Sequence, residues 1–203
     1  MAEKQDGKLI VGITGATGTI FGVRLLQILE GTGVETHLVM SKWAARTLLH
    51  ETSYTAEEVQ QMATCFYSSA DQGAPVSSGS FLTRGMIVAP CSMRTLAAIA
   101  NGMGDNLIHR AADVILKERR KLVLMVREAP LSDIHLENML KLSRMGVVIQ
   151  PPVPAFYNHP HTIDDIVNHT VQRALDQFEI HIDVVSRWDG VMLRGGKVSK
   201  ASE

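Results

Sequence analysis

The stretch Lys8–Gly22, with the sequence KLIVGITGATGTIFG, decides the fold of this chain. Its first half, Lys8–Thr14, is a short apolar run rich in β-branched residues, which predicts a buried strand. Apolar residues recur with helical spacing after Gly18, so a helix is expected to begin there. A strand, a glycine-lined turn and a helix N-terminus place backbone N–H groups around a small concavity that favours an anion. The alternative is a tight strand-to-helix turn that binds no ligand.

The composition of the 203-residue chain is typical of a globular domain. Hydrophobic residues make up 45% and charged residues 20% of a chain long enough for one substantial core. The formal net charge of −1 and the aromatic content of 5% argue against a protein that binds nucleic acid or a membrane surface. No apolar run approaches the roughly 20 residues of a membrane span, and the polar N-terminus does not form a signal peptide. With Cys65 and Cys91 as its only cysteines, the chain is expected to be cytoplasmic.

Apolar strand-like runs alternate with helical runs along the chain. After the opening stretch, strands are expected at residues 34–40, 85–90, 122–126 and 147–149, and helices at 41–51, 55–63, 106–120, 132–145 and 164–178. This alternation predicts an α/β fold of Rossmann or flavodoxin type, with a doubly wound parallel sheet between two helical layers. We expect a single domain over residues 1–203, with its core at about residues 8–180. The C-terminal tail, residues 181–203, is expected to pack on a neighbouring subunit.

Helical spacing predicts which side chains face the core. Leu136, Met139 and Leu140 are expected to point inward from the helix at 132–145. The apolar stripe of the last helix is expected to begin at Ile163. Ser41 precedes a helical run and is the expected N-cap, because its hydroxyl accepts a hydrogen bond from a first-turn N–H group.

A second strand-to-helix turn repeats the chemistry of the first. Ala89 and Pro90 end a buried strand, and Cys91–Thr95 brings small hydroxyl residues to the start of a helix. Two such turns at neighbouring strand ends predict a nucleotide-type pocket at the carboxyl edge of the sheet. The glycines do not form GxGxxG, and Met40–Lys42 offers no acidic residue for a ribose hydroxyl, which excludes a dinucleotide-dependent dehydrogenase. A mononucleotide with one phosphate, such as FMN, fits better.

Two pairs of charged residues lie where this fold places either ligands or solvent. Arg110 and Lys117 are seven residues apart, so they share one helix face at roughly 10 Å from each other. They either line an anion site or belong to a solvated face. Arg127 and Glu128 follow the strand at 122–126, at the sheet edge that carries ligands, and the alternative for them is a surface ion pair. The sequence alone leaves these alternatives open.

A proline-rich segment at residues 151–158 forms a stiff loop that holds Tyr157 in place. This loop either packs against a neighbouring subunit or walls a site. Arg173 falls at the edge of the apolar stripe of the last helix, where it reaches a buried margin. His159 and His161 have no third ligand at metal-binding spacing, so no metal site is predicted.

Seven motifs of the chain resemble those of the UbiX-type flavin prenyltransferases. In chain order they are TGATG (14–18), SKWA (41–44), SSGS (77–80), APCSMRT (89–95), RAADVILKERRKLVLMVREAPL (110–131), IHLENMLKLSRMG (134–146) and PPVPAFYNHP (151–160). The likeness covers about Lys8–Trp188. PPVPAFYNHP and THLVMSKWA are most similar to the branch of the family that is named after the phenolic or hydroxyarylic acid decarboxylases. The chain departs from the family in reading GATG for GASG and CSMR for CSMK.

The resemblance implies an activity, a cofactor and partners. Members of the family join the dimethylallyl group of dimethylallyl monophosphate to N5 and C6 of reduced FMN. The product, prenylated FMN, serves a UbiD-type decarboxylase of aromatic acids. The family also forms large homo-oligomers.

The resemblance further implies roles for individual residues. FMN would be held by Gly15, Ala16, Thr17, Ser41, Ser92, Met93, Arg94, Thr95 and Arg127. The dimethylallyl phosphate would be held by Lys117, Tyr157, Arg173 and Arg110. Glu51 and Glu128 would line the prenyl site with Thr17 facing the flavin, and Glu128 is the expected proton acceptor. Arg and Lys would stabilise charge that develops on the leaving phosphate, so no metal is required.

Two other functions are weighed against this one. The related cysteine-decarboxylase flavoproteins carry a PASANT-like turn and an early catalytic histidine. This chain has APCSMRT at that turn, and its early histidine, His37, lies within a predicted strand. A non-catalytic subunit that only delivers flavin is the third function, and the presence of Glu128, Lys117, Tyr157 and Arg173 argues against it.

Overall fold

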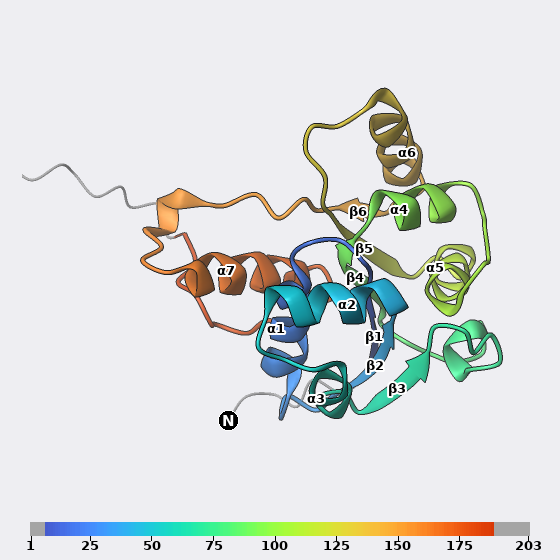
Figure 1. Ribbon diagram of the computed structural model, residues 1–203, viewed down its shortest axis with the longest axis horizontal. Helices are drawn as coiled ribbons and strands as arrows, with labels where there is room; N and C mark the ends of the chain where they lie inside the picture. Colours follow the sequence, from blue (N-terminus) through green and yellow to red (C-terminus); the bar gives the residue numbers. More distant parts are fainter. Residues whose placement is uncertain (1–6, 189–203) are drawn as a thin grey trace, which may run out of the picture.

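A six-stranded parallel sheet forms the centre of the protein (Figure 1), in a computed structural model that describes residues 7–188. The strands are β1 (Gly7–Ile13), β2 (Val34–Met40), β3 (Cys65–Ser68), β4 (Gly85–Cys91), β5 (Lys121–Val126) and β6 (Val148–Ile149). They pair in the order β3-β2-β1-β4-β5-β6, which is the strand order of the Rossmann fold. The order reverses between β1 and β4, so ligands are expected outside the carboxyl ends of these two strands.

Helices cover both faces of the sheet, as Figure 1 shows. The helices are α1 (Thr19–Leu29), α2 (Lys42–Glu51), α3 (Ala56–Gln61), α4 (Met93–Ala100), α5 (Leu107–Lys117), α6 (Asp133–Arg144) and α7 (Ile163–Asp176), with short 3-10 turns η1 (Pro75–Ser77) and η2 (Phe156–Asn158). One apolar cluster joins the sheet to α1, α2, α3 and α7, and a second joins it to α4, α5 and α6. The three-layer, doubly wound fold is thereby confirmed. Within residues 7–188, no helix is both long and apolar enough to cross a membrane.

Alternation along β1 explains how the opening stretch builds both cores. Leu9, Val11 and Ile13 belong to the cluster under α1 and α7, whereas Ile10 belongs to the cluster under α5. All four side chains are almost completely buried, as expected for a central strand covered on both faces. The run of consecutive apolar residues is therefore the sequence signature of a strand buried on both faces.

Three details of the sequence prediction are wrong. β3 was not predicted, because this short edge strand alternates half-buried and exposed residues and has no continuous apolar run. Leu136 and Leu140 are half exposed, because α6 packs on the rest of the chain through the narrower stripe of Met139 and Leu142. Ile163 is 79% exposed, since it is the first residue of α7 and lies beyond the part of the helix that packs in the core.

The hydroxyl of Thr14 joins the ends of β1 and β4. Thr14 follows β1 directly, is 2% exposed, and donates from Oγ1 to the carbonyl oxygen of Pro90 at 2.7 Å. The Oγ1 atom of Thr14 also accepts a hydrogen bond from the backbone N–H of Ser92 at 2.8 Å. One side chain thus fixes the two strand ends between which the order reverses.

Replacing Thr14 by Val is expected to destabilise the protein by about 1–3 kcal/mol, because the N–H of Ser92 loses its partner in a partly buried place. The free energy of unfolding, measured in urea with an unchanged slope, checks this expectation. The control is Thr47→Val, which removes an exposed hydroxyl that donates to the carbonyl oxygen of Trp43. Equal unfolding free energies for the two variants would contradict the role of Thr14.

Candidate functional site

Three helix N-termini converge on one cleft at the carboxyl edge of the sheet. The N-caps are Ser41 for α2, Ser92 for α4 and Asn106 for α5, and each side-chain oxygen accepts a hydrogen bond from a first-turn backbone N–H group. All three N-caps line a cleft of about 450 Å³, a size typical of small-molecule sites. Because each helix N-terminus carries a partial positive charge, the cleft favours an anionic group such as a phosphate.

Close packing explains why Gly15 is needed beside this cleft. A β-carbon at Gly15 would lie 2.4 Å from the β-carbon of Trp43, so any other residue would push α2 away from the β1 turn. Gly15, Trp43, Arg94 and Thr95 all line the cleft. Ala16 and Thr17 continue the turn after Gly15, and neither lines the cleft itself.

His109 and its neighbour Asn106 line the cleft and were not predicted as site residues. His109 is 3% exposed, and its Nδ1 atom has no hydrogen-bond partner among the described residues. Burial and then the nearby Arg94 lower the pKa of the His109 imidazole, and Asp105 opposes them only in part, so the ring is neutral at pH 7. An unpartnered buried polar atom beside three helix N-termini suits a polar ligand such as FMN. The N-cap pattern before Leu107 is the signal from which Asn106 could have been predicted.

The N-terminus of α1 already binds an anion, which is the carboxylate of Glu51. Its Oε2 atom accepts hydrogen bonds from the backbone N–H groups of Gly18 at 2.9 Å and Thr19 at 3.2 Å, and from the Thr19 hydroxyl at 3.1 Å. Burial by itself would raise the pKa of Glu51, but hydrogen bonds from Thr17, Gly18 and Thr19 hold it below its usual value. The concavity expected in the opening turn therefore exists, and the chain fills it with its own carboxylate.

Tyr157 and Arg173, both expected at the dimethylallyl phosphate, lie together in a second pocket. This pocket has a volume of about 380 Å³ and also contains His169 and Trp188. The Tyr157 hydroxyl lies 3.2 Å from Nε2 of His169. Burial and then Arg173 lower the pKa of His169, and Asp176 opposes them, so the ring is uncharged at pH 7. A neutral imidazole can accept a hydrogen bond from the phenolic O–H group and so orient the tyrosine.

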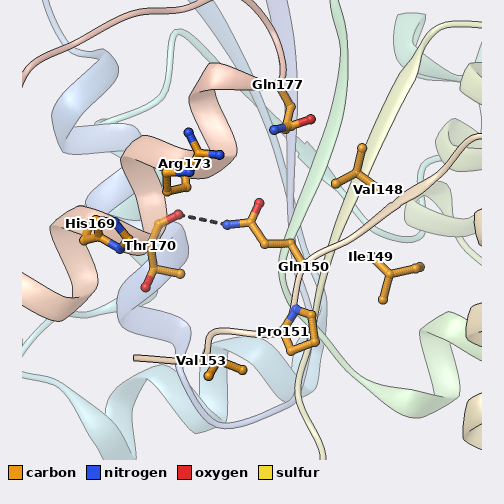
Figure 2. Close-up of a pocket in the computed structure, with 9 residues that line it drawn as sticks. All are labelled: Val148, Ile149, Gln150, Pro151, Val153, His169, Thr170, Arg173 and Gln177. Atoms are coloured by element: carbon orange, nitrogen blue, oxygen red, sulfur yellow. Dashed lines mark hydrogen bonds between the residues drawn. The ribbon is translucent and has the colours of Figure 1, made fainter. Parts of the chain in front are cut away.

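A third pocket of about 260 Å³ adjoins the second, and Figure 2 shows its lining. His169 and Arg173 line both pockets, so Arg173 lies between the two volumes. On the other side of this pocket, the amide of Gln150 donates from Nε2 to the carbonyl oxygen of Thr170 at 3.0 Å (Figure 2). That bond ties the start of the proline-rich loop to α7.

The other predicted site residues lie elsewhere in the chain. Lys117 is the last residue of α5 and pairs with Glu118, roughly 16 Å along the helix axis from the N-cap in the cleft. Arg110 pairs with Asp113 at 2.7 Å. Arg127 and Glu128 are exposed after β5, where the backbone N–H of Arg127 donates to the carbonyl oxygen of Cys91.

The remaining predicted residue, Met93, is half buried and packs against the apolar cluster under α5. One chain thus brings together Gly15, Ser41, Ser92, Arg94 and Thr95 in the cleft, and Tyr157 with Arg173 in the second pocket. Lys117 joins neither group. Among the described residues, no cluster of three or more His, Cys, Asp or Glu side chains is arranged to hold a metal ion.

The strand order and the cleft define a Rossmann-type α/β protein with a site that favours an anionic group. The family described as Flavoprotein matches residues 1–175 of the chain. A probable UbiX-like flavin prenyltransferase of Bacillus subtilis (strain 168) is 61% identical over 189 residues, which is 93% of each chain. The chain belongs to the flavoprotein family and, within it, to the UbiX-like flavin prenyltransferases, which confirms the predicted family.

Solved structures of related proteins share the fold over nearly their whole length. AnUbiX (PadA1), in complex with FMN and dimethylallyl pyrophosphate, is 51% identical with a TM-score of 0.91, over 93% of this chain and 100% of that one. The dodecameric FMN-dependent UbiX-like decarboxylase of Escherichia coli O157:H7 is 62% identical with a TM-score of 0.88, over 90% of this chain and 100% of that one.

Replacing Glu51 by Gln is expected to destabilise the protein at pH 7 and to have a smaller effect at pH 3. A carboxyl whose pKa is lowered on folding stabilises the protein fully above its unfolded pKa, about 4.3 for Glu, and loses this effect as the pH falls through the folded pKa. Urea unfolding of both proteins from pH 7 to pH 3 checks this expectation. A destabilisation of equal size at both ends of the range would contradict it.

Proposed function

We propose that this protein joins the dimethylallyl group of dimethylallyl monophosphate to N5 and C6 of reduced FMN. The observation that carries the proposal is the cleft in which three helix N-termini meet at the ends of β1 and β4. Reduced FMN supplies the two ring atoms that accept the prenyl group. A separate pocket with Tyr157 and Arg173 supplies a phenol and a guanidinium suited to a phosphate.

The residues around the cleft suit FMN. The helix N-termini capped by Ser41 and Ser92 provide N–H groups for its phosphate, and Arg94 adds a positive charge at the same edge. Thr95 and Ser92 are hydrogen-bonded to each other at 3.1 Å through their hydroxyls. We assign Gly15, Ala16, Thr17, Met93 and Arg127 to the remainder of the FMN site.

The prenyl transfer needs a phosphate to leave and a ring proton to be removed. Lys117, Arg173 and Arg110 provide positive charge, and Tyr157 provides a hydrogen bond, where negative charge develops on the leaving phosphate. Glu128 accepts the proton from the ring carbon, which is a task for a positioned carboxylate. Glu51 accepts a hydrogen bond from Thr17 and so orders the turn that carries it. We assign both residues to the prenyl site.

The position of Lys117 supports a site built from more than one chain. Lys117 lies roughly 16 Å along α5 from the N-cap in the cleft of its own chain, and it lines neither that cleft nor the pocket of Tyr157 and Arg173. The solved relative from Escherichia coli O157:H7 is dodecameric. We therefore propose a large homo-oligomer in which a neighbouring chain supplies Lys117 to each cleft.

Three further assignments complete the proposal. The chain forms one flavoprotein domain over residues 1–203 and acts in the cytoplasm. Its product, prenylated FMN, passes to a UbiD-type decarboxylase of aromatic acids.

A cysteine-decarboxylase activity is less well supported, because His37 is buried in β2 between Tyr67 and Phe81 and does not line the cleft.

The proposed reaction is tested by mixing the protein anaerobically with reduced FMN and dimethylallyl monophosphate and weighing the extracted flavin by mass spectrometry. We expect the mass of FMN plus one prenyl group. Glu128→Gln is expected to bind FMN normally but to slow the reaction about 100-fold or more, because the proton acceptor is lost. The matched control, Glu137→Gln on the exposed face of α6, should keep the wild-type rate. An unchanged flavin mass with the wild-type protein would contradict the proposed function.

The shared site is tested by complementation between two impaired variants. Lys117→Met removes the ammonium, and Gly15→Val distorts the cleft, because its β-carbon has no room beside Trp43. Each variant alone should lose most activity, and mixed oligomers made by co-expression should regain part of it. Mixing Gly15→Val with Ser92→Val, which alter the same cleft, should give no recovery. If Lys117→Met and Gly15→Val together stay inactive, each cleft uses the Lys117 of its own chain.

A further inference from the structure

The side chain of Gln172 holds the chain beyond α7 against that helix. Gln172 is 2% exposed, and its Oε1 atom accepts hydrogen bonds from the backbone N–H groups of Val184 at 3.0 Å and Val185 at 2.9 Å. Its Nε2 atom donates to the carbonyl oxygen of Val185 at 3.2 Å. We call residues 181–188 the C-terminal segment. A buried amide that makes three bonds to the backbone of one segment fixes that segment in place.

Asp176 provides a second attachment one turn further along α7. The carboxylate of Asp176 is 9% exposed and accepts hydrogen bonds from both terminal nitrogens of Arg187, each at 2.9 Å. The same carboxylate accepts a bond from Arg173 at 2.9 Å and lies 3.2 Å from Nδ1 of His181. The C-terminal segment is thus tied to α7 at Val184–Val185 and again at Arg187.

These two attachments place Trp188 against Tyr157. The rings of Trp188 and Tyr157 are 5.7 Å apart and nearly perpendicular, and His169 contacts Tyr157 in the same way at 5.8 Å. Edge-to-face contacts of this kind orient an aromatic ring. Tyr157 belongs to the short η2 turn of the proline-rich loop and is half exposed, so its orientation depends on these neighbours. Ser186, Arg187 and Trp188 also form one wall of the pocket that contains Arg173.

We propose that Gln172 is a positioning residue for the dimethylallyl phosphate, acting through the C-terminal segment and Trp188 on Tyr157. The inference rests on the proposed function, in which Tyr157 and Arg173 bind that phosphate. Gln172 makes its bonds to the backbone of the C-terminal segment, so its effect on the ligand is indirect. Without Gln172 the C-terminal segment is less ordered before the ligand binds. The free energy needed to order it then makes the binding of dimethylallyl monophosphate weaker.

The test compares Gln172→Met, which keeps the size of the side chain and removes its hydrogen bonds, with the wild-type protein. The control is Gln27→Met, which removes a hydrogen bond from α1 to the Tyr54 hydroxyl. Amide hydrogen exchange of the C-terminal segment reports the attachment. Calorimetry with dimethylallyl monophosphate and protein loaded with oxidised FMN reports binding without turnover. Steady-state kinetics with reduced FMN separates KM for dimethylallyl monophosphate from kcat.

In Gln172→Met, exchange at Val184 and Val185 should be at least tenfold faster, and the Kd and KM for dimethylallyl monophosphate should each rise about tenfold. The affinity for FMN should stay within about twofold, and Gln27→Met should change none of these values.

Faster exchange with an unchanged Kd would overturn the inference, as would unchanged exchange. If Gln172→Met does not fold, Val185→Pro removes one of the bonded N–H groups from the exposed segment and should raise the Kd in the same direction. A wild-type protein that binds dimethylallyl monophosphate and leaves FMN unmodified would contradict the proposed function, and the dependence of the Kd on Gln172 would still decide the inference.

Discussion

The bond network of the Thr14 hydroxyl determines where the cleft forms. A parallel sheet whose order reverses has a gap between the connections that follow its two central strands, and in this protein those strands are β1 and β4. Thr14 closes the gap at the level of the backbone by linking Pro90 and Ser92. Because Ser92 is the N-cap of α4, this link also fixes where α4 begins relative to the turn after β1. Thr14 and Ser92, which this link joins, both line the cleft.

The electrostatic potential at the carboxyl edge of the sheet depends on four helix N-termini, of which three face the cleft and one is bonded to Glu51. The N-termini of α2, α4 and α5 face the cleft through Ser41, Ser92 and Asn106, which leaves their partial positive charge available to a ligand. The N-terminus of α1 is different, because Glu51 from the end of α2 neutralises it. The glycine-lined turn therefore has a structural function in joining α1 to α2. Gly15 of the same turn lines the cleft, and the N-termini of α2, α4 and α5 remain available to a ligand there.

Apart from the edge strand β3, the order of the elements could be predicted from the sequence, and so could the Ser41 cap and the hydroxyl residues Ser92 and Thr95 of the cleft, because each depends on a local pattern. The Glu51 contact links residues 33 positions apart, and no local pattern contains it. Apolar periodicity likewise shows which face of α6 is hydrophobic, but it does not show that Leu136 and Leu140 remain exposed in this chain. The resemblance placed Lys117 at the phosphate, yet only the length of α5 shows how far it lies from the cleft of its own chain. Local chemistry was predictable, and long-range assembly was not.

The carboxylate of Glu51 also bears on which nucleotides the protein accepts. In a Rossmann fold that binds a dinucleotide, the diphosphate lies at the N-terminus of the first helix. Here that place holds the negative charge of Glu51, whose pKa is lowered by hydrogen bonds from Thr17, Gly18 and Thr19. A diphosphate bridge would meet repulsion and find the N–H groups of Gly18 and Thr19 already bonded. The N-terminus of α1, where the Rossmann fold holds the diphosphate of NAD or FAD, is thus occupied in this chain by its own carboxylate.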